Sequence, residues 1–567
     1  MKPGLMHRGL IARRLMLRIG RTLLIAAGLF SAAPDFRAAA QGPPPAQAPA
    51  TEPKGQLTLG LYSLGTSEQW LPWLESGREG WLTLEPIYES LVSVAVKGEL
   101  EPQLAERWEV DPTGQRWRFF LRKGIKFHDG VTEFTAEDVK FSFEQYISDK
   151  SVASSKPVLA AAVERIEITG PHDLTFHLKK PDAIFLVRMA QTSFGVVSKS
   201  YLERVGDKEA AAKPIGTGPY KLVEHRRQQF ARFEAVAPHW RETGRFKTVL
   251  LRRVPDQAAR VAMLRAGEID VTDVPFRLKR EVEAAGLKLF RIEEAVVYYV
   301  QLGGQLLPTR ETLDTTVPWV GDPKDPASLE RAAKVRLALN LAVDKATIIK
   351  SIFEGEGRLA AVPYLITGGP YVPDDLKPTA YDPKEAKRLL VEAGYPSGFS
   401  REIEVLLMPF PGRLEMNDVG EAVAGYWERN LGLKAKRRPM DYATYAATIG
   451  LKRQTAWLIW THGATPRLVS EPIYGMDTWA FSTSRFNTVM ESPALDALAA
   501  KARTAVDPKL RGEAYREMAR LFHAGHHAVP IAVVPQLYAY NPKKIAAWPL
   551  PPGEAYIAGY ERAVPMK

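Results

Sequence analysis

Cysteine is absent from the 567 residues, and this absence excludes several kinds of site. No disulfide framework, thiol nucleophile or thiolate metal site can form. There is also no cysteine behind the N-terminal apolar run to carry a lipid. Downstream of that run, no segment approaches the roughly 20 apolar residues that a membrane-spanning helix needs.

Catalytic motifs are missing as well. The chain contains no His-Glu-x-x-His, no Gly-x-Ser-x-Gly and no dinucleotide fingerprint. His128-Asp129 has the composition of an acid–base pair, but neighbouring residues of an extended chain point to opposite faces, and a turn through Gly130 explains the pair better. Residues 214–220, PIGTGPY, lack the Lys and Ser/Thr of a phosphate loop, so we expect a tight turn. The sequence favours binding over turnover, and we expect no enzyme.

Three histidines near the C-terminus are the best metal ligands that the sequence offers. His523 and His527 have helical i, i+4 spacing, with His526 between them, but Gly525 interrupts the helix. We therefore expect no metal site here and no cofactor.

The N-terminus has the order of a secretory signal peptide. A basic leader precedes the apolar residues 23–30, and small residues lead to Ala38-Ala39-Ala40. Arg13-Arg14 resembles a twin-arginine signal, so the general and the twin-arginine export routes both stay open. We expect cleavage near Ala40 and a soluble, unlipidated protein in the periplasm of a Gram-negative bacterium. Residues 41–54 are predicted to be a disordered Pro/Ala-rich spacer.

Net charge and length limit the possible partners and the domain organisation of the mature chain. Much of the net charge of +11 belongs to the leader, so we infer no nucleic-acid partner. The mature chain is too long for one core and should form at least two lobes. Short strands and helices alternate, as in an α/β protein. Helix starts are predicted at Thr135, Asp382 and Asp507, and strands at 57–61, 117–121, 165–169, 174–178, 296–301, 402–408, 456–459 and 529–534.

Six segments, in order, resemble the bacterial extracellular solute-binding proteins of family 5, the peptide/nickel class that serves ABC transporters. The longest is PQLAERWEVDPTGQRWRFFLRKGIKFHDGVTEFTAEDVKFSFE at 102–144. The others are PIGTGPYKL (214–222), RVAMLRAGEIDV (260–271), VRLALNLAVDK (335–345), YDPKEAKRLLVEAGYPSGF (381–399) and residues 492–522.

The resemblance implies a two-lobed periplasmic binding protein fold of type II, an α/β fold with an extra subdomain on the first lobe. The first lobe would span 55–294, the second 295–533, and 534–567 would return to the first. Strands 296–301 and 529–534 would be the hinge. A monomer would close on a small organic solute and deliver it to the permease subunits of an ABC importer. A sensor for a signalling partner is an alternative on the same fold.

The resemblance also places the cleft. Peptide-binding members carry WGADY-like text after the strand equivalent to 456–459, and its Asp pairs with the peptide amino terminus. Here the loop reads WTHGATPR, in which Trp460 fits the tryptophan and His462, Gly463 and Thr465 stand near the missing acid. The further candidates for the cleft are Tyr62, Ser63, Leu64, Gly65, Trp70, Gly303, Gly304, Thr461 and Arg467.

The missing acid shapes the expected solute. A buried ammonium needs a paired charge, or its desolvation costs several kcal/mol. A neutral, anionic or aromatic non-peptide solute therefore fits better than an ordinary peptide, with Trp460 stacking on it and Arg467 pairing with its anionic group. The alternatives are that Trp460 packs within the lobe, that Arg467 points to solvent, and that His462 either caps a turn or binds the metal of a nickel-type chelate.

Overall fold

The computed structural model describes residues 37–39, 52–76, 78–153, 155–190, 194–410, 412–465, 471–484, 486, 490–551 and 556–567. Phe36–Lys567 forms one compact unit. Of the predicted signal peptide, only β1 (Arg37–Ala39) lies within the described residues, and it pairs with β5 (Ala105–Val110). No helix within these ranges is long and apolar enough to cross a membrane.

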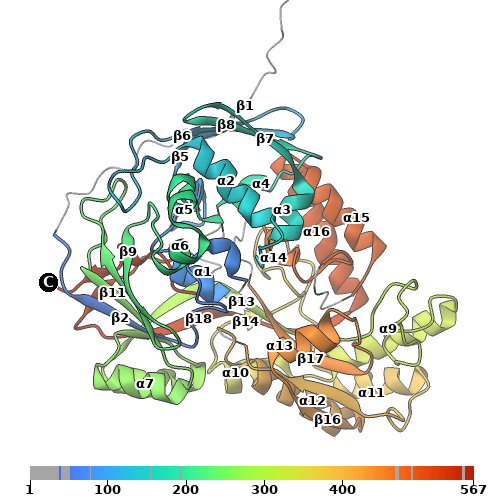
Figure 1. Ribbon diagram of the computed structural model, residues 1–567. Helices are drawn as coiled ribbons and strands as arrows, with labels where there is room; N and C mark the ends of the chain where they lie inside the picture. The colour runs from blue at the N-terminus through green and yellow to red at the C-terminus, as the bar shows by residue number, and fades with distance from the viewer. Residues whose placement is uncertain are drawn as a thin grey trace, which may run out of the picture. The chain divides into compact units, whose positions relative to one another are not determined.

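An eleven-stranded sheet runs through the described chain (Figure 1). Its order is β16-β15-β17-β13-β18-β12-β2-β11-β10-β9, and β14 pairs with β18 beside this path. The strands are β2 (Gln56–Leu61), β9 (Tyr220–Arg226), β10 (Phe230–Ala235), β11 (Thr248–Arg253), β12 (Val271–Asp273), β13 (Lys288–Leu302), β14 (Arg358–Leu359), β15 (Ile403–Leu407), β16 (Ala435–Pro439), β17 (Leu458–Ala464) and β18 (Ala528–Tyr540).

Two long strands, β13 and β18, join the two halves of this sheet. They pair antiparallel along most of their length, but the ladder is interrupted between Ile292 and Val296 and its register shifts again between Tyr298 and Tyr299. Glu294 lies in this break with a φ of +54°. On one side of the break β18 also pairs with β12, and on the other β13 also pairs with β17. The predicted hinge segments 296–301 and 529–534 are parts of these longer strands.

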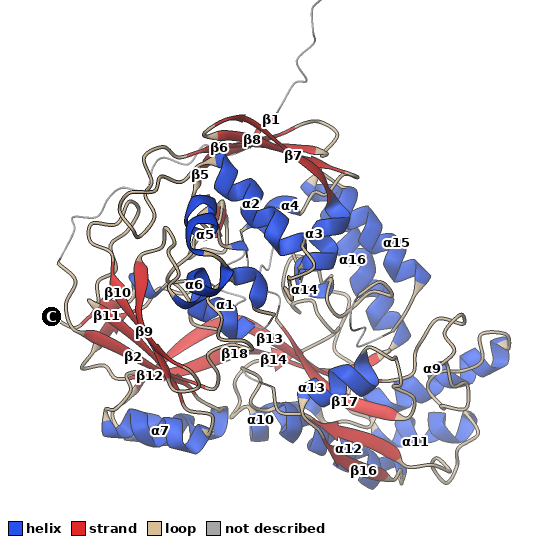
Figure 2. Ribbon diagram, in the orientation of Figure 1, coloured by secondary structure: helices blue, strands red, loops and turns tan. Residues whose placement is uncertain are grey.

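Helices cover each half of the sheet (Figure 2). α7 (Gln257–Ala266) contacts β2 and β12, and α12 (Met416–Leu431) contacts β15 and β17. The alternation of strands and helices confirms the α/β class. The other helices beside these strands are α8 (Lys279–Ala284), α9 (Pro326–Leu341), α10 (Lys345–Ile352), α11 (Pro383–Glu392), α13 (Tyr442–Tyr445), α14 (Ile473–Met476), α15 (Pro493–Thr504) and α16 (Pro508–Gly525).

A second sheet has five strands in the order β1-β5-β6-β8-β7, with α2 against it (Figure 1). Nearby, α4 (Phe185–Met189) brings Val187 and the preceding Ile184 into one core with residues of α15 and α16. The members not yet given are β6 (Arg116–Leu121), β7 (Val163–Gly170), β8 (Asp173–Leu178), α2 (Ala136–Ile147) and α3 (Lys156–Ala162). The remaining short elements are α1 (Arg78–Leu84), β3 (Val92–Val94), β4 (Leu100–Pro102), α5 (Lys199–Val205), α6 (Asp207–Ala212), β19 (Ile545–Ala547) and β20 (Val564–Pro565).

The three predicted helix starts are confirmed. The amide of Thr135 donates to Asp138 Oδ2 at 2.8 Å, as an acidic capping box requires. Asp382 accepts from two backbone amides at the start of α11, and Asp507 accepts from one at the start of α16. Each helix begins where its capping side chain can satisfy amides that have no partner within the helix.

The two motifs that resemble catalytic or phosphate loops pack on each other. The amide of His128 donates to the carbonyl of Gly216 at 2.9 Å, and the imidazole lies 2.9 Å from the carbonyl of Gly218. Asp129 accepts from the amides of the following turn. A Cβ at Gly216 would lie 1.9 Å from a backbone oxygen, so the glycine permits this close approach. The predicted turn at Asp129-Gly130 is confirmed. Residues 217–219 form a bend instead of a hydrogen-bonded turn, because the amides of Gly218 and Tyr220 donate to the carbonyls of Ile87 and Pro86.

Candidate functional site

A pocket of about 190 Å³ lies between the two halves of the large sheet. Tyr62 follows β2, Pro255 follows β11 and Asp273 ends β12, which are neighbouring parallel strands. From the other half, Pro409 and Phe410 follow β15. The carboxyl ends of parallel strands are where α/β proteins bind ligands. The full lining is Tyr62, Pro255, Gln257, Arg260, Asp273, Pro409, Phe410, Arg413, Leu414, Met416 and Asn417.

Arg413 connects this pocket to the predicted cleft loop. Its guanidinium donates to the carbonyl of Gly463 and to Thr465 Oγ1, and it lies 3.4 Å from the hydroxyl of Tyr556. The ring of Phe410 is 5.5 Å from the guanidinium carbon. Among the described residues, no carboxylate pairs with Arg413. A cation therefore lines the pocket with only neutral oxygens as partners.

The second arginine in the lining is already neutralised. Arg260 is almost fully buried, and its guanidinium lies 3.2 Å from Asp273. Two backbone carbonyls and Thr272 take further N–H groups of the same side chain. In contrast, Nε2 of Gln257 is buried without a hydrogen-bond partner in the described structure. The pocket is thus lined by one arginine whose charge no carboxylate of the described residues neutralises.

The segment WTHGATPR is not the loop that the sequence predicts. Strand β17 runs through Ala464 and includes Trp460, His462 and Gly463. Gly463 pairs with Tyr298 of β13 in the middle of the sheet. A Cβ at Gly463 would lie 2.4 Å from Cδ of Arg413, so this glycine makes room for a crossing side chain rather than for a turn. The end of the segment, including Arg467, lies outside the described residues.

His462 is held by aromatic neighbours. Its Nδ1 lies 3.1 Å from the hydroxyl of Tyr299, and its ring centroid is 5.0 Å from that of Trp479. Burial lowers the pKa of His462 to about 3, and Arg413 adds to the effect. The imidazole is therefore neutral at physiological pH and can donate or accept hydrogen bonds.

The other residues of β17 that the sequence singles out face packed surroundings. Trp460 is 1% exposed and lies in a small core with Leu406 and Tyr445. Thr461 points toward α12, where a Cβ on Gly420 would lie 3.0 Å from its hydroxyl oxygen. In the described structure Trp460 packs within the lobe, which was the alternative to stacking on a solute.

Of the loop after β2, Tyr62 alone lines the pocket. Its side chain is 47% exposed, whereas Leu64 is buried. The hydroxyl of Ser63 accepts from the amide of Gly65, which adopts a positive φ in a turn. Trp70 is buried, with its indole N–H 3.3 Å from His225. Tyr62 is therefore the member of this group that joins Arg413 and Thr465 near the pocket.

Gly303 and Gly304 lie beyond the end of β13 and do not line the pocket. A Cβ on Gly303 would lie 2.2 Å from the carbonyl oxygen of Thr455. The indole N–H of Trp319 donates to the carbonyl of Gly303 at 2.7 Å. Gly304 has a φ of +80° and donates to Thr455. These contacts give the two glycines a role in close backbone packing.

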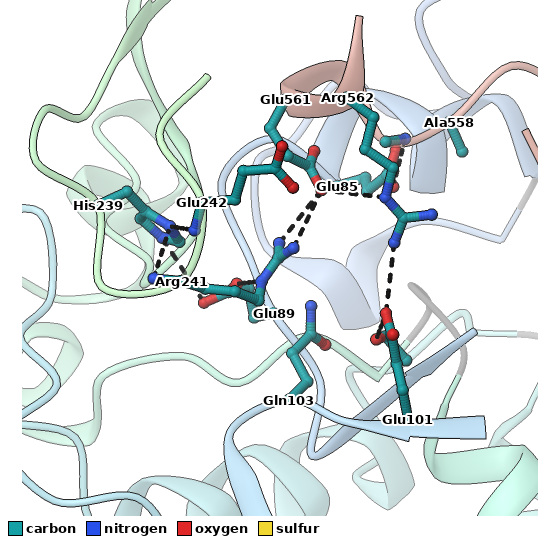
Figure 3. Close-up of polar contacts among 12 residues, drawn as sticks. Glu85, Glu89, Glu101, Gln103, His239, Arg241, Glu242, Ala558, Glu561 and Arg562 are labelled. Carbon is teal, nitrogen blue, oxygen red and sulfur yellow. Dashed lines mark hydrogen bonds and ion pairs between the residues drawn. The ribbon is translucent and has the colours of Figure 1, made fainter. Parts of the chain in front are cut away.

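The C-terminal segment, residues 556–562, contributes Glu561 and Arg562 to a buried ionic network (Figure 3). Arg241 lies 3.1 Å from Glu89 and 3.2 Å from Glu561. Glu85 accepts from the amide of Gly559 at 2.9 Å. Burial and the nearby Glu561 raise the pKa of Glu85 to about 7. At its other end the segment places Tyr556 against Gly412 and Arg413.

Arg413 is the residue that the sequence analysis missed. No local pattern marks it, because its partners lie 50 or more positions away in the chain. One signal was present: residues 409–413 directly follow the predicted strand 402–408, and the carboxyl end of such a strand is a usual ligand site.

Comparison with known proteins gives the family. The profile of "bacterial extracellular solute-binding proteins, family 5" matches residues 99–487. Heme-binding protein A of Haemophilus influenzae is 27% identical over 475 residues, which cover 79% of this chain and 82% of that protein.

Solved structures share the fold. A periplasmic binding protein of Helicobacter pylori in complex with the peptide STSA has a TM-score of 0.73 at 22% identity, covering 91% of this chain and 98% of its own. AgaA of A. tumefaciens R10, in complex with agropinic acid, has a TM-score of 0.71 at 21% identity, covering 90% and 99% of the two chains.

Proposed function

Since this chain belongs to the bacterial extracellular solute-binding proteins of family 5, we propose that it captures an anionic organic solute rather than an ordinary peptide. Members of the family are two-lobed substrate-binding proteins of ABC importers, not enzymes, and this chain is one of them. As a monomer exported to the periplasm, it would hold the solute between its lobes and present it to a permease.

One observation carries the choice of solute. Arg413 lines the pocket, and its partners within the described structure are a carbonyl and two hydroxyl groups. A partly buried cation without a paired anion is costly, and a carboxylate of the solute would remove that cost with a charge-assisted bond.

The body of the solute follows from the rest of the lining. Tyr62 and Phe410 supply aromatic surface, and Leu414 and Met416 supply apolar surface. Drug-sized ligands use cavities of roughly 300 Å³ or more, so this pocket suits one end of a solute. That the fold accepts a non-peptide acid is illustrated by AgaA with agropinic acid.

The first test is native mass spectrometry of residues 41–567, purified without denaturant. We expect an organic adduct that leaves on denaturation, and its mass separates a peptide from a metal complex and from another acid. If the protein is bare, a thermal-shift screen of acidic and aromatic solutes supplies the probe. Stabilisation by free-amine peptides alone would contradict the proposal.

The decisive variant is Arg413→Ala, titrated calorimetrically with the solute so identified. We expect binding to weaken by about 1.5–3 kcal/mol, the range for a hydrogen bond to a charged group. Arg429→Ala removes the same charge from the exposed far end of α12 and should leave the affinity unchanged. Equal affinities for the wild type and Arg413→Ala would exclude this role.

A metal-chelate receptor is the second candidate, favoured by one observation. The pKa of His462, lowered to about 3 by burial, keeps the imidazole neutral, and a metal ligand must be unprotonated. Stabilisation by nickel that disappears in His462→Ala would support this candidate. Stabilisation by a carboxylate without any metal would favour the anionic solute.

A further inference from the structure

The pocket lining contains one acid besides its two arginines. Asp273 ends β12 in the half of the sheet that contains β2, whereas Arg413 follows β15 in the other half. Both side chains line one cavity of about 190 Å³, so a single small solute can contact both. With Arg260 as the third charged side chain, the lining has a net charge of +1.

The carboxyl of Asp273 has few donors. Nη2 of Arg260 lies 3.2 Å from Oδ1 and 3.5 Å from Oδ2. The hydroxyl of Thr272 is also 3.2 Å from Oδ1, but it has one proton, and its shorter contact, at 2.9 Å, is with the carbonyl of Gly60. Within the described ranges, no other donor reaches this carboxyl. A carboxylate accepts several hydrogen bonds, so Asp273 can take a further one from a solute.

Arg260 neutralises Asp273 and leaves the carboxyl as the accessible member of the pair. The side chain of Arg260 is 1% exposed, against 13% for Asp273. Further N–H groups of Arg260 go to Thr272 and to the carbonyls of Val254 and Pro255. Because the pair is neutral as a whole, it attracts a solute cation weakly, while its carboxylate can still accept from a neutral donor.

We propose that Asp273 determines which acids the pocket accepts: a monoanion that carries a neutral hydrogen-bond donor, such as a hydroxyl group, opposite its carboxylate. The inference rests on the capture of an anionic solute by Arg413, proposed above, and adds the group at the other end of that solute. A monoanion balances the net charge of the lining. A second carboxylate at the far end meets Asp273 instead, and because like charges repel, diacids are excluded.

Substituted benzoates are suitable probes. An apolar cavity of about 150 Å³ holds a benzene ring, and Tyr62 and Phe410 give this pocket aromatic surface. Benzoate, para-hydroxybenzoate, para-(aminomethyl)benzoate and terephthalate share one ring and one carboxylate. They differ in the group at the opposite end, which is a hydrogen, a hydroxyl, an ammonium or a second carboxylate.

The test is isothermal titration calorimetry of the four acids with the wild-type protein at neutral pH. We expect para-hydroxybenzoate to bind about tenfold more tightly than benzoate, the factor for one hydrogen bond to a charged acceptor. The ammonium acid should bind more weakly than the hydroxy acid, and terephthalate at least about tenfold more weakly than benzoate. The proposal is overturned if the hydroxy acid does not rank first, if terephthalate binds as well as benzoate, or if none of the four binds.

Asp273→Asn separates specificity from stability. The amide oxygen can keep the contact with Arg260, while the negative charge is lost. We expect terephthalate to bind this variant at least about tenfold more tightly than the wild type, a gain that damage to the fold does not produce. A folded variant without this gain also overturns the proposal. If the variant does not fold, the order of the four acids on the wild type decides.

Two further variants complete the test. Asp375→Asn makes the same change at an exposed ion pair with Arg520, outside the lining, and should keep the wild-type order. Arg413→Ala should weaken all four acids by a similar factor. Unchanged affinities in Arg413→Ala would refute the capture of the carboxylate by Arg413, whereas a wild type that binds terephthalate best would refute the role of Asp273 alone.

Discussion

Gly463 shows how one missing Cβ sets the geometry of the pocket. Thr and Pro neighbours make it look like part of a turn, yet it lies in β17, opposite Tyr298. The space that its side chain would fill is taken by Arg413, whose Cδ would be 2.4 Å from a Cβ there. The cation reaches the pocket because the strand beneath it has no side chain at this point.

Gly463→Ala should therefore displace Arg413. We expect a loss of about 1–3 kcal/mol in the free energy of unfolding, because the added methyl group overpacks the site. Carboxylate binding should weaken with it. Gly425→Ala, inside α12, is the control and should be neutral or stabilising, because its nearest neighbour is the end of a flexible Arg429 side chain. Chemical denaturation and calorimetry measure both quantities, and an unperturbed Gly463→Ala would mean that Arg413 adapts freely.

Single elements differ in how much of them the sequence predicts. α11 begins at Pro383 because Asp382 accepts from the amides of Lys384 and Glu385, a contact within four residues. Such local chemistry can be recognised without the fold. The extent of β17 depends on pairing with β13 and β15, and those strands are remote in sequence. A Gly–Thr–Pro composition therefore predicted a loop where distant partners impose a strand.

The C-terminal segment is held as an element by the network of Figure 3, in which Arg241 is the central cation. Arg241→Met would leave Glu89 buried without its arginine partner and Glu561 with only Arg562, at 3.8 Å. We expect a loss of about 3–5 kcal/mol in the free energy of unfolding at pH 7, and a smaller loss at pH 5, where protonation removes the uncompensated charges.

Arg245→Met is the control for that change. Arg245 pairs with Glu242 at 3.6 Å on the surface, so its loss should cost less than about 1 kcal/mol. Urea denaturation of both variants at the two pH values measures the difference. A loss for Arg241→Met that does not depend on pH would show that packing, rather than charge, anchors the segment.

At the scale of the whole molecule, an ionic cluster outside the pocket lining joins α4 to α14 and α15. Arg188 on α4 lies 3.0 Å from Asp182 and 2.8 Å from Asp477, which also pairs with Arg503 of α15 at 2.7 Å. Asp477 thereby links α4, near the five-stranded sheet, to α15. Ile184 and Val187 bury apolar surface at the same contact.

Asp477→Asn should weaken the contact between α4 and α15. Arg188 keeps Asp182 but loses one charged partner in a buried place, so we expect the open form to gain population and the radius of gyration of the solute-free protein to rise. Small-angle X-ray scattering measures the change. Asp207→Asn removes an exposed partner of Lys150 and should leave the scattering curve unaltered. Identical curves for Asp477→Asn and the wild type would refute the role of these ion pairs in keeping the molecule compact.

The candidate site, like the fold, was predictable in part from the resemblance to the family. Tyr62 was predicted from the family resemblance, in which the loop after the first strand faces the ligand. The missing acid near His462 also pointed to a non-peptide solute, which stays a proposal. Arg413 was not predicted, because only its position after a predicted strand marks it in the sequence, and its contact with Gly463 forms only on folding.

The break in the β13–β18 ladder has a kinematic consequence. Two strands cross between the halves, and both are hydrogen-bonded on either side of the interruption at Glu294, with a second register shift between Tyr298 and Tyr299. Sliding one strand along the other would break all the backbone hydrogen bonds between them, whereas twisting at the interruption would leave these bonds in place. We therefore expect the halves to move mainly by a twist near this interruption. A permease that contacts both halves would then distinguish the loaded receptor from the empty one by the angle between the halves.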